Sequence, residues 1–208
     1  MFREVSLDFQ ENFQISHDKA AQQFYQGLYY LYLKFSKFEY RSQIIGPHGS
    51  GKTTLLVPLI NILENCNHKI ISVTLHDNKQ KLPMSFWKNC KKLKEWIKSQ
   101  DKTDYKKKTP IIVIDGYEQL SVSQRKKILQ LCFTEKWGIL ATTHKIIRQI
   151  PILFRTKTSP EILEEIVNYL LKKNGQTPPF DHSLYFTLLE QYHGNIRDIL
   201  FSLYDLYE

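Results

Sequence analysis

Residues 46 to 53 read Gly46-Pro47-His48-Gly49-Ser50-Gly51-Lys52-Thr53. They fit the pattern G-x-x-x-x-G-K-[ST], in which backbone N–H groups curl around a phosphate and the following helix directs its positive end at the same anion. In this pattern the lysine reaches the β- and γ-phosphates of a nucleotide, and the final hydroxyl binds Mg²⁺. The stretch therefore predicts a nucleotide site, and its expected binding residues are Gly46, Pro47, His48, Gly49, Ser50, Gly51, Lys52, Thr53 and Thr54.

The residues on either side of this loop have the patterns that the motif requires. Before the loop, 41–45 ends in two isoleucines, which predicts a short strand. After it, 52–63 carries leucine and isoleucine at helical spacing. A strand before and a helix after the loop favour phosphate binding over a glycine turn that binds nothing.

Further apolar runs predict four more strands, over 69–75, 110–115, 138–143 and, more briefly, 152–155. The run 110–115 is apolar up to its final aspartate, as in strands that a parallel sheet buries on both faces. Helical patterns cover 17–38, 86–97 and 121–133, the last with Ser121 as its cap. This alternation of strands and helices indicates an α/β core.

From residue 159 onward the pattern is helical only. Ser159 and Pro160 are typical of a helix start, Gly175 marks its end, and two further helices are expected over 181–192 and 195–207. We therefore expect three parts: an N-terminal helical segment (1–40) packed on the core, a nucleotide-binding α/β core (41–157) and an α-helical lid (158–208).

Two carboxylates are candidates for the chemistry. Asp115 ends the apolar strand 110–115, where a rigidly held acid next to a phosphate loop would bind Mg²⁺. In many ATPases a glutamate follows this aspartate directly, but here the position is Gly116. Glu118 is the nearest other carboxylate, and we expect it either to orient the attacking water or to lie on the surface.

Two polar positions complete the expected site. Thr142, Thr143 and His144 end the strand 138–143, and Thr143 is expected to lie between the γ-phosphate and the water, with strand capping as the alternative. Arg197 opens the last helix, where a moving lid could bring it onto the γ-phosphate. The alternative for this arginine is a surface position near Asp198.

In chain order, the segments 46–53, 111–115, 142–143 and 194–197 resemble the Walker A, Walker B, sensor 1 and sensor 2 motifs of AAA+ and related STAND ATPases. The segment 114–120 is similar to the Asp-Gly-x-Asp-Glu-Leu form of the second motif in STAND proteins, and the whole chain resembles small, uncharacterised bacterial P-loop ATPases. The resemblance implies a three-layer α/β P-loop NTPase fold, with a mostly parallel five-stranded sheet in the order 5-1-4-3-2 and a small C-terminal α-helical lid. It also implies ATP and Mg²⁺ as cofactors, and it makes Arg148 and Arg155 candidates for an arginine finger that acts on a neighbouring subunit.

Composition limits the protein class. The chain has 208 residues, of which 42% are hydrophobic, enough to build a core. No apolar run approaches the roughly 20 residues of a membrane span, and the N-terminus lacks the order of a signal peptide. The three cysteines have neither metal spacing nor a disulfide framework, so we expect buried thiols and a cytoplasmic location.

Net charge is +8, and much of the excess lies between Lys88 and Lys108. This segment is a candidate contact for nucleic acid, with a solvated surface as the alternative. The first interpretation of the chain is a Mg²⁺-dependent ATPase that acts as a nucleotide-driven switch on a protein partner, a second copy or nucleic acid, with slow turnover. The alternatives are a nucleotide-gated binding module and a small-molecule or nucleotide kinase, while GTP is disfavoured because no Asn/Thr-Lys-x-Asp element occurs.

Overall fold

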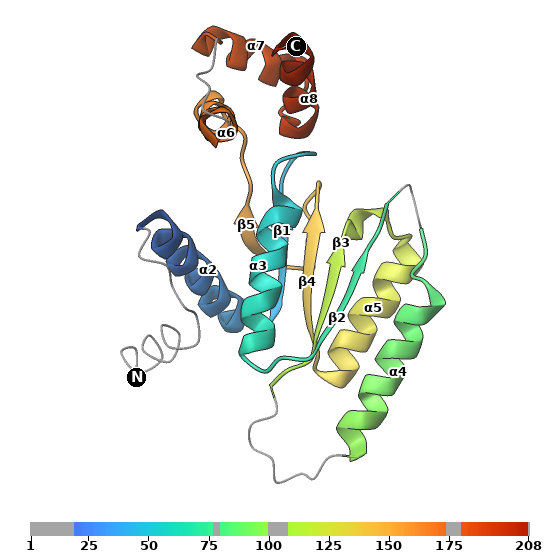
Figure 1. Ribbon diagram of the computed structural model, residues 1–208. Helices are drawn as coiled ribbons and strands as arrows, with labels where there is room; N and C mark the ends of the chain where they lie inside the picture. The colour runs from blue at the N-terminus through green and yellow to red at the C-terminus, as the bar shows by residue number, and fades with distance from the viewer. Residues whose placement is uncertain (1–18, 77–79, 100–107, 174–179, 208) are drawn as a thin grey trace.

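A five-stranded sheet lies at the centre of the protein in the computed structural model, which describes residues 19–76, 80–99, 108–173 and 180–207 (Figure 1). The strands are β1 (Arg41–Ile45), β2 (Ile70–Thr74), β3 (Ile111–Asp115), β4 (Gly138–Thr143) and β5 (Ile152–Arg155). Their order is β2-β3-β4-β1-β5, and all neighbours are parallel. The expected fold class and strand order are confirmed, since 5-1-4-3-2 is the same order read from the other edge.

Burial follows the place of each strand in the sheet. Every residue of β3 and β4 is buried, whereas the edge strands β2 and β5 contain exposed residues. Parallel strands at the centre of a sheet are covered on both faces, which explains why their sequences are apolar without alternation.

Helices cover both faces and give the protein three layers. Helices α2 (Lys19–Lys37) and α3 (Lys52–Asn65) pack with Ile111 and Val113 on one face. Helices α4 (Met84–Ser99) and α5 (Val122–Glu135) pack with Ile112 and Ile114 on the other (Figure 1). Successive side chains of a strand point to opposite faces, so β3 divides its isoleucines between the two layers.

The predicted N-terminal helix corresponds to α2, and residues before 19 lie outside the described part of the chain. Its apolar positions, among them Leu28 and Phe35, are buried against α3 and the sheet. Lys34 Nζ donates a hydrogen bond of 2.6 Å to the carbonyl of Leu153 in β5. This helix therefore covers the β1–β5 side of the sheet.

The C-terminal helices α6 (Pro160–Lys173), α7 (His182–Gln191) and α8 (Ile196–Tyr207) form a three-helix unit with its own small core. The unit lies beyond the carboxyl ends of the strands, beside the connection from β1 to α3 (Figure 1). The predicted cap at Ser159 is present, because its Oγ accepts a hydrogen bond of 3.4 Å from Ile162 N. The predicted helix end at Gly175 lies outside the described residues.

The cysteines are free thiols, as expected. Cys90 and Cys132 are buried, while Cys66 is only partly buried. Burial raises the pKa of the Cys90 thiol to about 11 and that of Cys132 to about 12, so both are protonated near neutral pH. Among the described helices, none is both long and apolar enough to cross a lipid bilayer.

Candidate functional site

The loop between β1 and α3 has the backbone conformation that phosphate binding needs. Gly49 and Gly51 have φ angles of 66° and 83°, in the left-handed region that glycine adopts without strain. Helix α3 begins at Lys52, and no side chain caps its first turn in the described structure. Its first N–H groups and the positive end of its dipole are therefore available to an anion.

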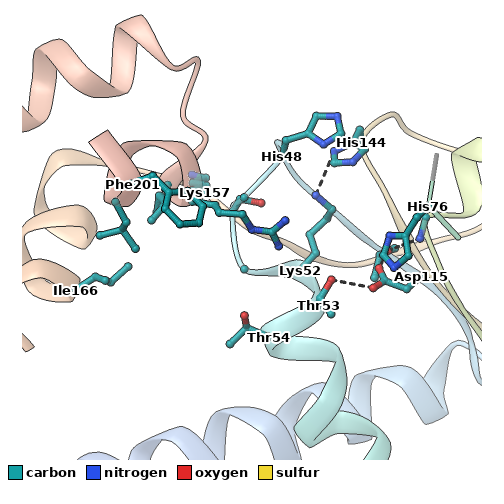
Figure 2. A pocket seen from close by; sticks show the side chains of 18 of the residues that line it. His48, Lys52, Thr53, Thr54, His76, Asp115, His144, Lys157, Ile166 and Phe201 are labelled. Carbon is teal, nitrogen blue, oxygen red and sulfur yellow. Dashed lines mark hydrogen bonds between the residues drawn. The ribbon is translucent and has the colours of Figure 1, made fainter. Parts of the chain in front are cut away.

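A cavity of about 1110 Å³ opens between this loop, the carboxyl ends of β3 and β4, and the three-helix unit (Figure 2). The α/β core contributes mainly polar side chains to it, and helices α6 and α8 contribute an apolar wall. The core residues are His48 to Thr54, Leu75, His76, Asp115, Gly116, Glu118, Gln119, Thr142 and His144. Those of the C-terminal side are Lys157, Ile162, Ile166, Ile196, Arg197, Leu200, Phe201, Tyr204 and Asp205.

Two predicted site residues are in direct contact. Thr53 Oγ1 donates a hydrogen bond of 2.8 Å to Asp115 Oδ2 (Figure 2). The other carboxylate oxygen of Asp115 accepts a hydrogen bond from the hydroxyl of Thr142, which itself accepts one of 2.9 Å from Gly116 N. The carboxyl end of β3 and the first turn of α3 are thus linked by the hydrogen bond between Asp115 and Thr53.

This pair of oxygens fits Mg²⁺. The ion prefers oxygen ligands, keeps several waters and takes one or two protein carboxylates together with the phosphates of its nucleotide. Thr53 and Asp115 supply one hydroxyl and one carboxylate. The described residues contain no cluster of three acidic, histidine or cysteine side chains that could hold a metal ion.

Lys52 lies folded over its own loop. Its side chain is 8% exposed, and Nζ donates to the carbonyls of Gly46 (2.9 Å) and Pro47 (2.6 Å). The third neighbour of Nζ is His144 Nδ1, at 3.1 Å (Figure 2). Burial lowers the pKa of Lys52, against the opposing effect of the carboxylates of Glu118 and Asp115. If a phosphate binds at the loop, Lys52 Nζ would leave these two carbonyl oxygens and donate to the phosphate oxygens instead.

Glu118 reaches the cavity because the chain turns sharply after β3. Gly116, with φ of 83°, is followed by a 3₁₀ turn at Tyr117–Gln119, and a Cβ atom on Gly116 would lie 2.8 Å from the carbonyl of Leu75. Glu118 Oε1 lies 3.2 Å from His144 Nε2. The turn after β3 therefore places Glu118 at the cavity, next to His144. The role of Glu118 as a base stays a prediction.

The expectation for Thr143 needs a correction. Its side chain is fully buried, and its hydroxyl donates a hydrogen bond of 3.1 Å to Gln43 Oε1, away from the cavity. Thr142 and His144, on either side of it, line the cavity instead. Side chains alternate along a strand, so a polar pair at a strand end places only one of its members at the site.

The other predicted residues are divided between the cavity and the surface. Arg197 lines the cavity, and the carboxylate of neighbouring Asp198 accepts a hydrogen bond of 2.6 Å from Asn195 Nδ2. Arg148 and Arg155, the candidates for an arginine finger, are exposed and do not line the cavity.

Several cavity residues had no signal in the sequence. The motifs did not indicate His76 or Lys157, which come from separate loops, or the apolar wall with Ile166 and Phe201 (Figure 2). The contacts of His144 with Lys52 and Glu118 join segments far apart in the chain, and no spacing rule predicts them.

No protein-family model and no curated protein sequence matches the chain. Solved structures do match. AMPPCP-bound DnaA from Aquifex aeolicus aligns with a TM-score of 0.52 and 16% identity over 86% of this chain and 59% of that one. A DNA replication initiation factor aligns with a TM-score of 0.50 and 15% identity over 90% of this chain and 60% of that one.

The chain spans about three fifths of the length of these two structures. At such low identity the likeness shows the fold alone. The chain has the P-loop fold of DnaA, with a parallel five-stranded sheet.

Proposed function

We propose that the protein binds ATP together with Mg²⁺, hydrolyses the nucleotide slowly and uses the nucleotide state to position the three-helix unit. The observation that carries this proposal is the hydrogen bond between Thr53 and Asp115. Thr53 directly follows the glycine loop, in the first turn of a helix whose N-terminus has no side-chain cap. This arrangement combines an anion site with the oxygen ligands of a divalent cation.

Each residue has a distinct task in this proposal. Lys52 leaves the carbonyls of its loop and donates to the β- and γ-phosphates. Thr53 and Asp115 hold Mg²⁺, which neutralises charge on the phosphates. Arg197 reads the γ-phosphate from the start of α8, and Glu118 takes a proton from the attacking water.

The nucleotide is proposed to be ATP. AMPPCP, the ligand of the DnaA structure, is an ATP analogue. In the cavity, Ile162 and Ile166 of α6 and Phe201 of α8 form an apolar surface that suits a purine base. The parts 41–157 and 158–208 would then act as nucleotide-binding core and lid, with 1–40 packed on the core.

Slow turnover is proposed because Gly116 occupies the position that often holds a glutamate. If Glu118 cannot replace that glutamate, the protein is a nucleotide-gated binding module with little turnover, and the STAND-like form of the segment 114–120 suits such a switch. A kinase is disfavoured, because Arg148 and Arg155 lie outside the cavity that a phosphoryl acceptor would share.

Nucleic acid is proposed as the partner, with a protein or a second copy as the alternative. Helix α4 exposes Lys88, Lys91, Lys92 and Lys98, while Glu95 lies 3.9 Å from Lys91 and opposes only part of this charge. Helix α5, which packs on the same face of the sheet, adds exposed Lys126 and Lys127. The rest of the lysine-rich segment, 100–107, lies outside the described residues. The free thiols suit the cytoplasm as the location of such a protein.

Calorimetric titration with Mg²⁺ and ATP tests the binding proposal. Replacing Lys52 with Ala removes the main cation at the outer phosphates and should weaken ATP binding by about 2 to 4 kcal/mol. The matched control is Lys145→Ala, an exposed lysine next to His144 that does not line the cavity. Equal affinity in wild type and Lys52→Ala would exclude the site.

A further inference from the structure

Three ionisable side chains from separate segments form a row at the edge of the cavity. Lys52 Nζ, in α3, lies 3.1 Å from His144 Nδ1, after β4. The other ring nitrogen, Nε2, lies 3.2 Å from Glu118 Oε1, in the turn after β3. One imidazole thus joins the phosphate-loop lysine to the nearest candidate base.

The two neighbours determine where the proton of the ring lies. A lysine ammonium only donates, so Nδ1 accepts from Lys52, and the proton of a neutral ring is on Nε2. There it donates to Glu118 Oε1. The opposite tautomer would direct a lone pair at a carboxylate. The carbonyl of Gly46 also lies 3.0 Å from Nδ1 and accepts a hydrogen bond of 2.9 Å from Lys52 Nζ, but it is a neutral acceptor, whereas the charged carboxylate at Nε2 is the stronger one and holds the ring proton.

The ring is also held from its face. His48 stacks on His144 with ring centroids 3.5 Å apart and ring planes at 27°. Burial, together with the charge of Lys52, lowers the pKa of His144, which favours the neutral ring. The groups that face His144 are thus Lys52, Glu118, His48 and the Gly46 carbonyl.

Glu118 has one oxygen held and one available. Oε1 faces His144, whereas Oε2 is buried and has no hydrogen-bond partner among the described residues. A buried acceptor without a partner costs free energy, and a water that donates to it removes that cost. The two oxygens belong to one rigid carboxylate. A hydrogen bond from His144 Nε2 to Oε1 therefore also fixes the position of Oε2.

We propose that His144 is a positioning residue for ATP hydrolysis, which holds Glu118 Oε1 so that Oε2 accepts a proton from the attacking water. In that step the water oxygen bonds to the γ-phosphorus, and the bond from that phosphorus to the β–γ bridging oxygen breaks, which releases ADP. One water proton passes to Glu118 and is later released to solvent. This inference rests on the proposed function.

Variants of His144 separate positioning from binding. Gln carries an amide nitrogen near the place of Nε2, while the shorter Asn carries one near the place of Nδ1. We expect His144→Ala and His144→Asn to lower kcat about 10- to 100-fold, within the range of acid–base contributions, with ATP affinity within about twofold of wild type. His144→Gln should keep kcat within about threefold, because it still donates to Glu118. Lys145→Ala is the neighbouring control.

Phosphate release at saturating ATP gives kcat, and calorimetry gives the affinity and shows that each variant still folds. On a Glu118→Gln background, His144→Ala should cause no further loss of kcat, since the two residues act as one unit. Unchanged kcat in His144→Ala, or additive losses in the double variant, would overturn the proposal.

A second measurement does not need turnover. Nitrogen-15 spectra of the histidine rings should show His144 with its proton on Nε2 in the wild-type protein, and a shifted Nε2 signal in Glu118→Gln. A proton on Nδ1 would contradict the positioning role even if ATP binds and is hydrolysed. Loss of ATP binding in the wild type would instead refute the proposed function itself, and with it the role of His144.

Discussion

Gly49 of the phosphate loop and Asn195 at the start of α8 are in direct contact. A Cβ atom on Gly49 would lie 2.0 Å from Asn195 Oδ1 and 3.1 Å from Arg197 N. The three-helix unit therefore rests on the backbone of the loop itself. A movement of this loop on binding a phosphate would therefore act directly on the segment that carries Arg197.

Gly49→Ala tests this contact. The methyl group would meet Asn195 and would also strain a residue with φ of 66°, a strain that costs about 1 to 3 kcal/mol. The matched control is Gly51→Ala, which has φ of 83° but no atom within 4 Å of the added Cβ. Urea unfolding without nucleotide should show a greater loss of stability for Gly49→Ala. Equal losses would mean that the clash is relieved at no cost.

Arg197→Ala should remove the preference for ATP over ADP. The arginine would contact only the γ-phosphate, and a hydrogen bond to a charged group contributes about 1.5 to 3 kcal/mol, or roughly tenfold or more in affinity. Competition binding with ATP and ADP measures the ratio, with exposed Arg148→Ala as the control. If the ATP-to-ADP ratio of Arg197→Ala matches that of wild type, this arginine does not read the γ-phosphate.

Asp115→Asn should abolish the dependence of ATP affinity on Mg²⁺. Asparagine can accept from one of the hydroxyls of Thr53 and Thr142 through its amide oxygen and donate to the other through its amide nitrogen, so the fold should be retained, but it lacks the charge that a hard cation requires. Titrations with Mg²⁺ and with excess EDTA should differ about tenfold or more for wild type and little for the variant. A Mg²⁺ dependence that survives in Asp115→Asn would exclude this carboxylate as a ligand.

Replacing the exposed lysines of α4 tests the nucleic-acid partner. Each phosphate contact contributes about −0.9 to the slope of log affinity against log salt for duplex DNA. Anisotropy titrations of labelled DNA at several salt concentrations should show this slope, and it should become shallower when Lys88, Lys91, Lys92 and Lys98 are changed to Ala. Lys145→Ala, an exposed lysine outside α4 and α5, serves as the control. Absence of binding at low salt would leave α4 as a solvated surface.

His68 should make stability depend on pH. It is 3% exposed, Nδ1–H donates to the carbonyl of Thr109 (2.7 Å), and Nε2 is buried without a hydrogen-bond partner among the described residues. Burial, with Lys108 adding to it, lowers the pKa of His68. Below about pH 6.5 the unfolded chain therefore binds a proton that the folded protein does not, and stability falls as the pH drops toward the folded pKa.

His68→Asn keeps a donor near Nδ1 and removes the titration. Urea unfolding between about pH 7.5 and 5 should then show a weaker loss of stability than in wild type, with exposed His182→Asn as the control. If His68→Asn and wild type lose the same stability over this range, His68 is not responsible for the pH dependence.

The sequence predicted the fold because the local patterns agreed with one another. The glycine loop, the apolar run of β3 and the serine caps at Ser121 and Ser159 each determine a short segment, and the segments assemble in one known order. The same local patterns predicted the positions of Lys52, the first residue of α3, and Asp115, the last residue of β3. These are positions that spacing along the chain is able to determine.

The sequence could not show which of Thr142 and Thr143 faces the cavity. Strand β4 is buried on both faces, so its sequence has no alternation to show which threonine faces the cavity. The row from Lys52 to Glu118 through His144 depends on the angle of a 3₁₀ turn and on ring orientation, neither of which is encoded by a local pattern.

The strand order also determines when the protein can fold during its synthesis. Strand β1 leaves the ribosome before its neighbours β4 and β5, which pair with it only about 100 residues later, at Arg41↔Ile139 and Gln43↔Ile152. Pairing across such distances is slow and exposes apolar strands in the meantime. A nascent chain that ends before β4 carries the complete phosphate loop without either sheet neighbour of β1, so nucleotide could stabilise the protein only after β4 and β5 have been made.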